Sequence, residues 1–379
     1  MNAEPRVLSV AQVSFFSDPQ GRSPEELLSA WPTLAQVAEA AAASGVRVTV
    51  LQASQHWTRL RRNDVDYHFL PFGGVASTAA GIDAFRELAA TLRPDVFHVQ
   101  GLGFARDVVA LAAVAPGVPI VVQDHADRPP RRFWRWPEVR RGLDAARGVL
   151  FCAREQARPF RRRGLLPART RVHEVPESTC DFTALDQARA RALSGVHGDP
   201  ALLWVGHLDR NKDPLTVLDG VSLAVRQLPG LKLWCCFGQA PLIREVRARI
   251  DGDPLLAGRV HLLGRVPHAQ VRTLMSAADF LVQGSHREGS GYAVIEALAC
   301  GLPPVVTDIP SFRTLTAHGT AGRLWPRRDA RALAQALVHL AMLPRAALRA
   351  GARAQFERDL SPAALGRALH AVYLDALRP

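Results

Sequence analysis

The chain repeats, twice over, an alternation of short apolar runs with helical stretches, and this pattern constrains the fold most. The apolar runs of the first half begin near residues 7, 46, 96, 120 and 149, and those of the second half span 202–205, 231–237, 260–263, 280–282 and 304–306. Continuously apolar strands separated by helices are typical of parallel sheets covered on both faces. A length of 379 residues also suits two domains. We therefore predict two α/β domains, each built on a parallel sheet.

A polar stretch rich in arginine and alanine separates the two patterns. We predict a first domain at 1–185, a second at 186–360 and a terminal helix at 361–379, with Ser361 as its N-cap and Pro362 at its start. We see no signal peptide, no apolar stretch of the roughly 20 residues that span a membrane, and no metal-type spacing among the five cysteines. These features predict a cytoplasmic protein with reduced thiols.

The net charge of +12 comes almost entirely from arginine. Only Lys212 and Lys232 are lysines, so 45 of the 47 basic residues are arginine, which is typical of a GC-rich bacterial genome. The charge favours either a polyanionic ligand or an anionic membrane surface. Arginine and aromatic residues mix at 128–137, where we expect an anionic acceptor or peripheral contact with the inner face of a membrane; a solvated basic loop is the alternative. No nucleic-acid motif accompanies the charge, so we expect no nucleic acid partner.

The segment 284–303 carries the strongest chemical signal. A loop rich in glycine and serine leads from a predicted strand into a helix beginning near Tyr292. Such a helix start attracts phosphate. Glu288 and Glu296 flank it, about 12 Å apart if the segment were wholly helical. Hydrolytic carboxylate pairs lie roughly 5–9.5 Å apart, so a glycosidase is disfavoured. The spacing suits a ligand with hydroxyl groups at both ends and phosphates between, such as a nucleotide sugar.

This segment resembles the E-x7-E motif of family 4 retaining glycosyltransferases, also described as glycosyl transferases group 1. The resemblance implies the GT-B fold, in which two Rossmann-like domains face each other across a cleft and the C-terminal helix crosses back to the first domain. It implies that Glu288 contacts the donor sugar and that Glu296 holds the ribose hydroxyls. The diphosphate would meet the backbone around Gly289, Ser290, Gly291 and Tyr292.

Two further segments of the second half resemble the same family. Residues 204–214 match its phosphate-binding loop, in which Lys212 would stabilise charge on the leaving diphosphate. His207 stands where arginine is usual, and Arg210 is our candidate to replace that arginine. Residues 260–267 resemble the strand and turn beside the nucleotide base, which implies that Arg265 and Val266 lie near the base.

The first half supplies the expected acceptor side. Residues 119–125 resemble the family segment whose histidine lies by the donor sugar, so His125 would lie near the reacting carbon; a hydrogen-bonded loop histidine is the alternative. His98 is either near the site or structural. The family's paired glycines in the first loop are reduced to Gly21, which we expect to let the backbone approach sugar or phosphate. Asp64-Val65-Asp66 resembles the metal-binding motif of another glycosyltransferase fold, but we interpret it as a polar turn.

Together these features predict a hexosyltransferase of polysaccharide or glycoconjugate biosynthesis. It would use a nucleotide-diphosphate sugar as co-substrate and need no cofactor. The family resemblance implies that it retains the anomeric configuration and needs no metal. The acceptor, anionic or lipid-linked, is unknown. A nucleotide-sugar epimerase on the same fold and a non-catalytic protein that binds anionic surfaces are the alternatives.

Overall fold

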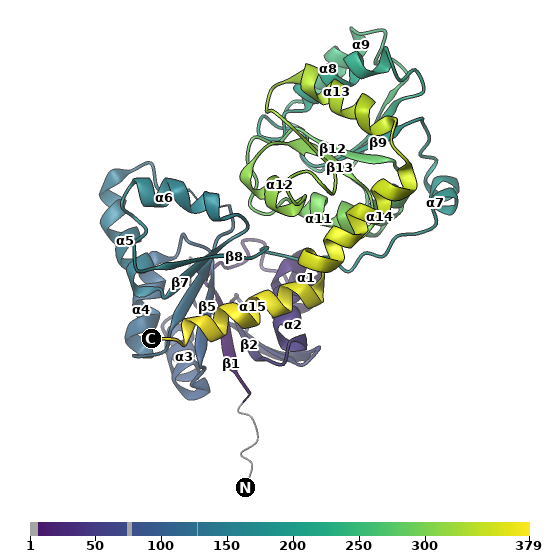
Figure 1. Ribbon diagram of the computed structural model, residues 1–379. Coiled ribbons are helices and arrows are strands. Elements are labelled where there is room, and N and C mark those ends of the chain that lie inside the picture. Colours follow the sequence, from purple (N-terminus) through teal and green to yellow (C-terminus); the bar gives the residue numbers. More distant parts are fainter. Residues whose placement is uncertain (1–6, 74–77, 127) are drawn as a thin grey trace. The chain divides into compact units, whose positions relative to one another are not determined.

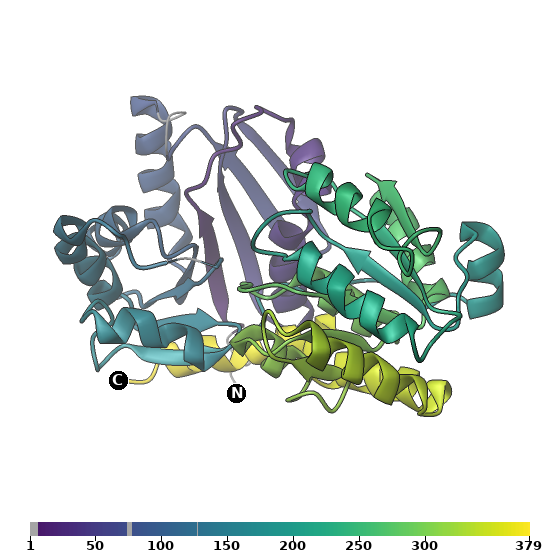
Figure 2. The ribbon, with the colours of Figure 1, turned by 90° about the horizontal axis from the view of Figure 1, so that it is seen from above.

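The computed structural model describes residues 7–73, 78–126 and 128–379. The chain divides into two compact units: unit 1 comprises Met1–Thr179 with Pro362–Pro379, and unit 2 comprises Cys180–Ser361. Each unit is a mainly or wholly parallel sheet with helices on both faces (Figures 1 and 2). The predicted domain limits at residues 185 and 360 stay predictions.

The sheet of unit 1 has eight strands in the order β3-β4-β2-β1-β5-β6-β7-β8. All neighbouring strands pair parallel except β3 and β4. The strands are β1 (Ser9–Ser14), β2 (Arg47–Ala53), β3 (Thr58–Arg62), β4 (Val65–Leu70), β5 (Val96–Gln100), β6 (Ile120–Gln123), β7 (Gly148–Phe151) and β8 (Arg171–Glu174). Asn63 and Asp64, both with positive φ, form the turn between β3 and β4. The Asp64-Val65-Asp66 segment is therefore a turn and the start of a strand.

Helices cover both faces of this sheet because alternate strand residues point to opposite sides. On one face, residues such as Val122 pack against α3 (Ala79–Leu92), α4 (Ala105–Val114) and α5 (Trp136–Ala145). On the other face, residues such as Val121 pack with α1 (Pro24–Ala30), α2 (Pro32–Ala43) and the C-terminal helix α15 (Pro362–Ala376). Three short pieces complete the unit, the 3-10 turns η2 (Phe133–Arg135) and η3 (Arg154–Ala157) and the helix α6 (Arg158–Arg162). The final helix thus packs on unit 1, beside α2 (Figure 1).

Local signals explain the start of α1. The Ser23 hydroxyl accepts the Glu26 N–H at 3.2 Å, while the Glu26 carboxylate accepts the Ser23 N–H at 2.9 Å. This reciprocal arrangement satisfies two backbone donors that would otherwise lack partners. Ser23 is therefore the N-cap of α1, with Pro24 in the first turn.

Unit 2 has a six-stranded, wholly parallel sheet in the order β11-β10-β9-β12-β13-β14. The strands are β9 (Ala201–Val205), β10 (Lys232–Cys236), β11 (Val260–Gly264), β12 (Phe280–Gln283), β13 (Pro304–Thr307) and β14 (Arg323–Trp325). The helices are α7 (Gln187–Ser194), α8 (Pro214–Val225), α9 (Ile243–Asp251), α10 (His268–Ala277), α11 (Tyr292–Ala299), α12 (Pro310–Leu315), α13 (Ala330–Ala341) and α14 (Arg345–Gln355).

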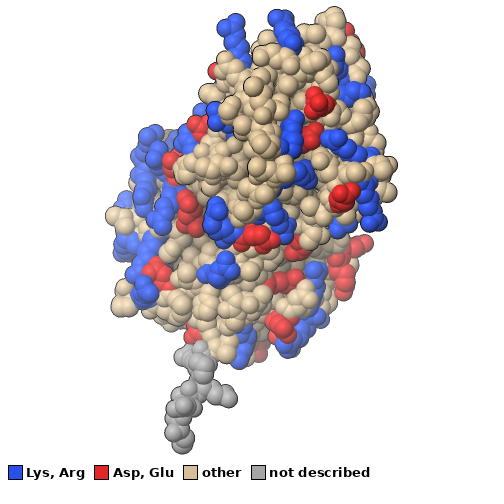
Figure 3. Space-filling model, turned by 45° about the vertical axis from the view of Figure 1, so that its right-hand side comes forward, with Lys and Arg blue, Asp and Glu red and all other residues tan. Residues whose placement is uncertain are grey.

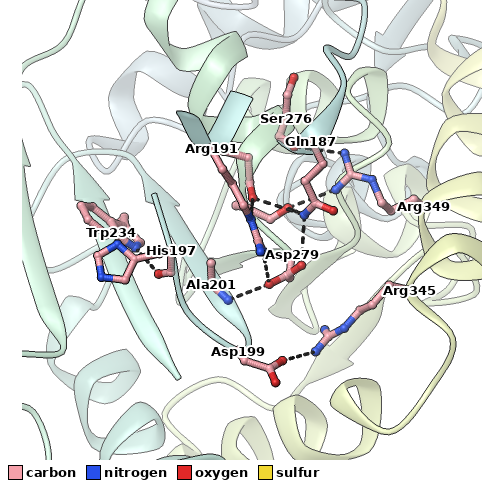
Figure 4. Close-up of polar contacts among 12 residues, drawn as sticks. Gln187, Arg191, His197, Asp199, Ala201, Trp234, Ser276, Asp279, Arg345 and Arg349 are labelled. Atoms are coloured by element: carbon pink, nitrogen blue, oxygen red, sulfur yellow. Dashed lines mark hydrogen bonds and ion pairs between the residues drawn. The ribbon is translucent and has the colours of Figure 1, made fainter. Parts of the chain in front are cut away.

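A buried carboxylate anchors the amino ends of two central strands of unit 2. Asp279, just before β12, accepts the Ala201 N–H at 2.8 Å, the Arg191 guanidinium at 3.0 Å and the Gln187 amide at 3.1 Å (Figure 4). These bonds attach α7 to the start of β9 and β12. The cluster lies at the amino edge of the sheet. We therefore assign its charged side chains a structural role.

Each sheet has one point where the strand order reverses direction. In unit 2 the order turns between β9 and β12, and in unit 1 it turns between β1 and β5. At such points the loops after the two strands diverge to opposite faces and leave a crevice at the carboxyl edge, where open α/β sheets bind ligands. The topology therefore marks residues 206–213 with 284–291, and residues 15–23 with 101–104, as the places to look for function.

Three further observations bear on function. Within the described ranges, no helix combines the length and apolarity needed to cross a bilayer. Among these residues, no three His, Cys, Asp or Glu side chains are placed to hold a metal ion. All five cysteines are buried and free.

Candidate functional site

Hydrogen bonds join the two loops at the reversal point of unit 2. The His286 N–H donates to the Asn211 carbonyl at 2.7 Å, and the Asn211 side-chain amide donates to the Arg287 carbonyl at 3.0 Å. The His286 ring lies 3.4 Å from the Asp213 carboxylate. These contacts hold the loop after β9 against the loop after β12, so side chains far apart in sequence meet.

Lys212 and Glu288 are brought together by this arrangement. Their Nζ and Oε1 atoms are 2.6 Å apart, and the side chains are only 18% and 14% exposed. The Lys212 backbone N–H donates to the Asp209 carboxylate at 2.8 Å, which fixes the turn that presents the lysine. An ammonium group has three N–H donors and Glu288 takes one, so Lys212 is held in place and can still donate toward an anion.

The amino end of α11 lies next in the chain and is shaped by a glycine. Gly291 is the N-cap residue, has φ of 77° and provides no side-chain cap. A Cβ atom at this position would lie 2.5 Å from the Phe312 ring, so both the backbone and the space require glycine. The helix begins at Tyr292, as predicted, and its dipole favours negative charge at this end. Glu288 lies in the loop, so the all-helical distance estimate does not apply to it.

Glu296 is buried in the second turn of α11 and is paired with a residue that the sequence analysis did not identify. Its side chain is 3% exposed and is hydrogen-bonded to the His268 ring. The His268 ring lies 4.9 Å from Phe182 and 6.1 Å from Tyr292, centroid to centroid. Burial raises the pKa of Glu296, and the bond to Glu296 raises the pKa of His268. Since His268 follows β11 at the carboxyl edge, the strand-end rule would have pointed to it.

The remaining predicted residues of unit 2 lie on the same edge. His207 is exposed after β9, and its Nδ1 accepts the Gln239 N–H at 3.0 Å. That nitrogen therefore carries no proton in this arrangement, and Nε2 is the ring's donor. Arg210 is exposed in the same loop; Arg265 and Val266 follow β11. Their contacts with a nucleotide, and those of Gly289 and Ser290, stay predictions.

In unit 1, His125 follows β6 and has partners on both ring nitrogens. Nε2 lies 2.8 Å from the Gln100 side-chain oxygen, and Nδ1 lies 3.1 Å from the Glu177 carboxylate. The side chain is 38% exposed. The sequence analysis missed Glu177, although it lies just beyond the carboxyl end of β8. The ring is thus held in one orientation while part of it faces solvent.

A buried polar chain connects His125 to the C-terminal helix. Gln100 lies 3.4 Å from the His98 ring, and His98 Nδ1 lies 2.9 Å from the Tyr373 hydroxyl on α15. The Tyr373 hydroxyl also accepts a bond from Gln12 at 3.4 Å. Burial lowers the pKa of His98 to about 3, so this ring is uncharged at neutral pH. Of the two interpretations of His98, the structure supports the structural one.

Gly21 has local partners in the first loop. Its φ is 61°, its N–H donates to the Asp18 carbonyl at 3.2 Å, and its carbonyl lies 3.2 Å from the His56 ring. A Cβ atom here would lie 3.0 Å from the Gln55 side-chain oxygen. The glycine thus permits a tight turn, and its approach to sugar or phosphate stays a prediction.

The basic and aromatic segment exposes its aromatic rings. Phe133 and Trp134 are 69% and 63% exposed, whereas the Trp136 indole N–H donates to the Pro130 carbonyl at 2.9 Å. The Arg132 guanidinium lies 5.6 Å from the centroid of Trp134. Elsewhere, on the face drawn in Figure 3, basic side chains are scattered among acidic ones. Two adjacent exposed rings among arginines are unusual for a solvated loop.

Two family models match the chain. The model described as "Glycosyl transferase 4-like domain" matches residues 30–176, and the model described as "Glycosyl transferases group 1" matches residues 199–342. A 2-deoxystreptamine N-acetyl-D-glucosaminyltransferase of Streptomyces fradiae is 30% identical over 68% of this chain and 65% of that protein. A GDP-mannose:cellobiosyl-diphosphopolyprenol alpha-mannosyltransferase of Xanthomonas oryzae pv. oryzae is 25% identical over 65% of each. The matches therefore span just under two thirds of these relatives' length.

Solved structures match almost the whole chain. A glycosyltransferase from Rickettsia africae has a TM-score of 0.71 at 13% identity, covering 98% of this chain and 99% of that one. Sucrose-phosphate synthase from Thermosynechococcus elongatus has a TM-score of 0.69 at 20% identity, covering 97% and 98%. Anabaena HepE in complex with UDP and glucose has a TM-score of 0.66 at 18% identity, covering 97% and 100%. These likenesses confirm the GT-B fold. The two family models show that the chain belongs to the family 4-type, group 1 glycosyltransferases.

Proposed function

We propose that the protein transfers a hexose-type sugar from a nucleotide-diphosphate sugar, which binds to unit 2. The observation that carries the proposal is the Lys212–Glu288 pair beside the amino end of α11. A lysine and the positive end of a helix suit a diphosphate, and a carboxylate suits sugar hydroxyls. The homologous glycosyltransferases support the same reaction class.

Lys212 has the central electrostatic role in this proposal. Breaking the bond between the sugar and the diphosphate leaves negative charge on the departing phosphate. Lys212 would stabilise this charge while one of its N–H groups stays on Glu288. Such a preorganised cation lowers the barrier because it needs no reorientation during the reaction. Glu288, fixed by the same ion pair, would accept a hydroxyl of the donor sugar.

Glu296 and its neighbours would hold the nucleoside end of the donor. Its buried carboxylate would accept ribose hydroxyls, with His268 holding one oxygen in place. Arg265 and Val266 would lie beside the base, and His207 with Arg210 beside the phosphates. In unit 1, His125, oriented by Gln100 and Glu177, would contact the transferred sugar. Retention of the anomeric configuration and independence of metal are part of this proposal, on the strength of the family resemblance.

Nucleotide binding tests the donor site directly. Thermal shift and calorimetry with UDP, GDP and ADP would be compared for the wild-type protein, Lys212→Ala and Lys232→Ala. Lys232 is the matched control because it is the chain's other lysine and pairs with His197. At least one nucleotide should bind, and Lys212→Ala alone should weaken it at least tenfold. No binding by any nucleotide, or equal weakening by both variants, would overturn the assignment.

The epimerase alternative makes a different product. The donor sugar that binds best would be incubated with the protein without any acceptor. A transferase should return the donor unchanged apart from slow hydrolysis. Accumulation of an epimer, seen by proton NMR of the anomeric signals, would replace the transferase proposal.

Contact with an anionic membrane is a second proposal, favoured by the exposed pair Phe133 and Trp134 among arginines. Aromatic rings with cationic neighbours suit the headgroup region of a bilayer. Co-sedimentation with phosphatidylglycerol vesicles should exceed that with phosphatidylcholine vesicles. The difference should shrink in the double variant Phe133→Ser, Trp134→Ser. Equal binding to both vesicle types would remove this proposal.

A further inference from the structure

A cavity of about 530 Å³ lies at the carboxyl edge of the sheet of unit 2. Its walls come from the loops that follow three neighbouring strands: His286 follows β12, Asp308 follows β13, and residues 326–328 follow β14. Its volume falls within the roughly 300–1,000 Å³ of small-molecule sites. None of the residues that we assign to the donor sugar, the diphosphate or the nucleoside is among its described lining residues. The cavity is therefore distinct from the proposed donor site.

Two adjacent arginines border this cavity without an acidic partner. Arg327 Nη1 donates to the His286 carbonyl at 3.3 Å, and neither Arg327 nor Arg328 forms an ion pair within the part of the chain that the structure describes. Both side chains are exposed, so a ligand can reach them. Their like charges repel each other, and an anion placed between them is attracted by both. A guanidinium can bind two phosphate oxygens at once, so the pair suits a phosphate group.

The acidic group of the lining is already neutralised. Asp308 is the only Asp or Glu among the described lining residues. Arg313, which lies outside the lining, binds both of its oxygens: Nη2 lies 3.0 Å from Oδ2, and Nε donates to Oδ1. The His286 ring lies 3.4 Å from the Asp213 carboxylate, which fixes its place in the wall. The cavity thus offers an anion two arginine charges that no acid of the lining compensates.

The turn that carries the two arginines has an uncommon backbone. Arg328 has φ of 63°, in the region that favours glycine. The Asp329 N–H closes the turn on the Pro326 carbonyl at 3.2 Å, and the Asp329 carboxylate accepts the Ala332 N–H at 2.9 Å as the N-cap of α13. Glycine would adopt the conformation of Arg328 at lower cost, so the arginine side chain is the feature that this position retains.

We propose that this cavity is a phosphate site, in which Arg327 and Arg328 together bind one phosphate group, either free or as a monoester. A phosphate monoester carries about −1.5 to −2 charges at neutral pH, which matches the two uncompensated arginines, whereas a carboxylate carries one. The inference goes beyond the proposed function, because neither the nucleotide nor the transferred sugar is assigned to this cavity.

Anion titrations test the proposal. Calorimetry would measure binding of inorganic phosphate, glycerol 3-phosphate and acetate to the wild-type protein and to the double variant Arg327→Gln, Arg328→Gln. The matched control is the double variant Arg244→Gln, Arg247→Gln, which removes the same charge from exposed positions of α9. An exposed ion pair contributes up to about fivefold, so losing two should weaken phosphate about fivefold or more, and the control should bind phosphate like the wild type.

The three anions distinguish the possible ligands. Tighter binding of glycerol 3-phosphate than of inorganic phosphate would identify an esterified ligand, and equal or weaker binding would identify free phosphate; both results support the site. No phosphate binding by the wild type, equal weakening in the two double variants, or acetate bound as tightly as phosphate would overturn the proposal.

A glycine variant separates binding from stability. Arg328→Gly removes one of the two cations but suits the positive φ at this position, so it should weaken phosphate about threefold while Tm stays the same or rises. Unchanged phosphate affinity in this variant would overturn the role of Arg328.

Lys212→Ala separates this inference from the proposed function. It should weaken nucleotide binding and leave the arginine-dependent binding of phosphate unchanged, because Lys212 is not part of the described lining. If phosphate binds through Arg327 and Arg328 but no nucleotide binds to the protein, the phosphate site stands and the transferase proposal fails. If nucleotides bind through Lys212 but phosphate affinity does not depend on the two arginines, the donor site stands and the phosphate site is wrong.

Discussion

The two reversal points have the same topology and opposite chemistry. In unit 2 the loops after β9 and β12 place an ion pair, Lys212 with Glu288, beside the amino end of a helix. In unit 1 the ends of β1 and β5 border a cavity whose described lining contains no Asp, Glu, Lys or Arg. The strand order therefore selects where a ligand can bind, and the side chains on the loops decide which kind of ligand.

The two points also differ in how their key residues are supported. In unit 2 the supporting bonds lie within the site, since its two loops bind each other through Asn211 and His286. In unit 1 the support for His125 is long-range, since it reaches Tyr373 on α15 through Gln100 and His98. Substitutions in these loops of unit 2 should thus affect nucleotide binding, and substitutions in the network of unit 1 should affect turnover.

The largest expected effect separates the two carboxylates. Glu288→Gln should lower kcat/KM at least about tenfold, because it removes the charge that fixes Lys212 and that, in our proposal, contacts the donor sugar. Glu177→Gln should lower turnover by less and leave nucleotide affinity unchanged, because Glu177 contacts His125. Steady-state kinetics and calorimetry on both variants would check this. Similar loss of nucleotide affinity in both would break the contrast between the units.

The next largest effect is expected at the amino end of α11 in unit 2. Gly291→Ala should lower the free energy of unfolding by about 2 kcal/mol or more, since the added Cβ meets Phe312 and the backbone has positive φ. Gly258→Ala is the matched control, because Gly258 has φ of 71° but no atom within 4 Å of the added Cβ. Urea unfolding followed by circular dichroism would give both values. Equal losses would mean that backbone strain alone, and not the close packing at α11, requires glycine.

A smaller effect is expected from the buried network of unit 1. Tyr373→Phe removes the hydroxyl shared by His98 and Gln12 and should lower the free energy of unfolding by about 1–2 kcal/mol. It should also reduce kcat, through the orientation of His125, without changing the Kd for nucleotide. Tyr67→Phe removes another largely buried hydroxyl, bonded to Glu39, and should leave kcat unchanged. An unchanged kcat in Tyr373→Phe would mean that the network contributes to stability and not to turnover.

The smallest effect is a pH dependence in unit 2. The pKa of His268 is raised above its ordinary value of 6.5 by its bond to Glu296. The folded state therefore binds this proton more tightly than the unfolded state, so the contribution is fully present below pH 6.5 and is lost as pH rises through the raised pKa. His268→Gln should flatten this decline in Tm while keeping a donor for Glu296. A wild-type and a variant curve that run parallel from pH 6 to 8.5 would contradict the assignment.

The order of apolar and helical segments sufficed to predict the fold class and most central strands. Burial on both faces forces such strands to be apolar along their length, so β6 and β12 are visible locally. Capping signals also act locally, as Ser23 and the Gly291–Tyr292 helix start show. The edge strand β3, with the sequence TRLRR, escaped prediction because one exposed edge lets charged residues form a strand.

The sequence by itself thus determined two parallel sheets, the family, and the positions of Lys212, Glu288 and Glu296 on loops and a helix start. Only the tertiary structure decided that Lys212 touches Glu288, that His268 pairs with Glu296, and that Gln100 and Glu177 hold the His125 ring. The physical reason is the separation along the sequence of the residues that interact. Strand and helix signals depend on neighbours a few residues away, whereas these contacts join residues brought together by sheet order and loop packing, which no local pattern records.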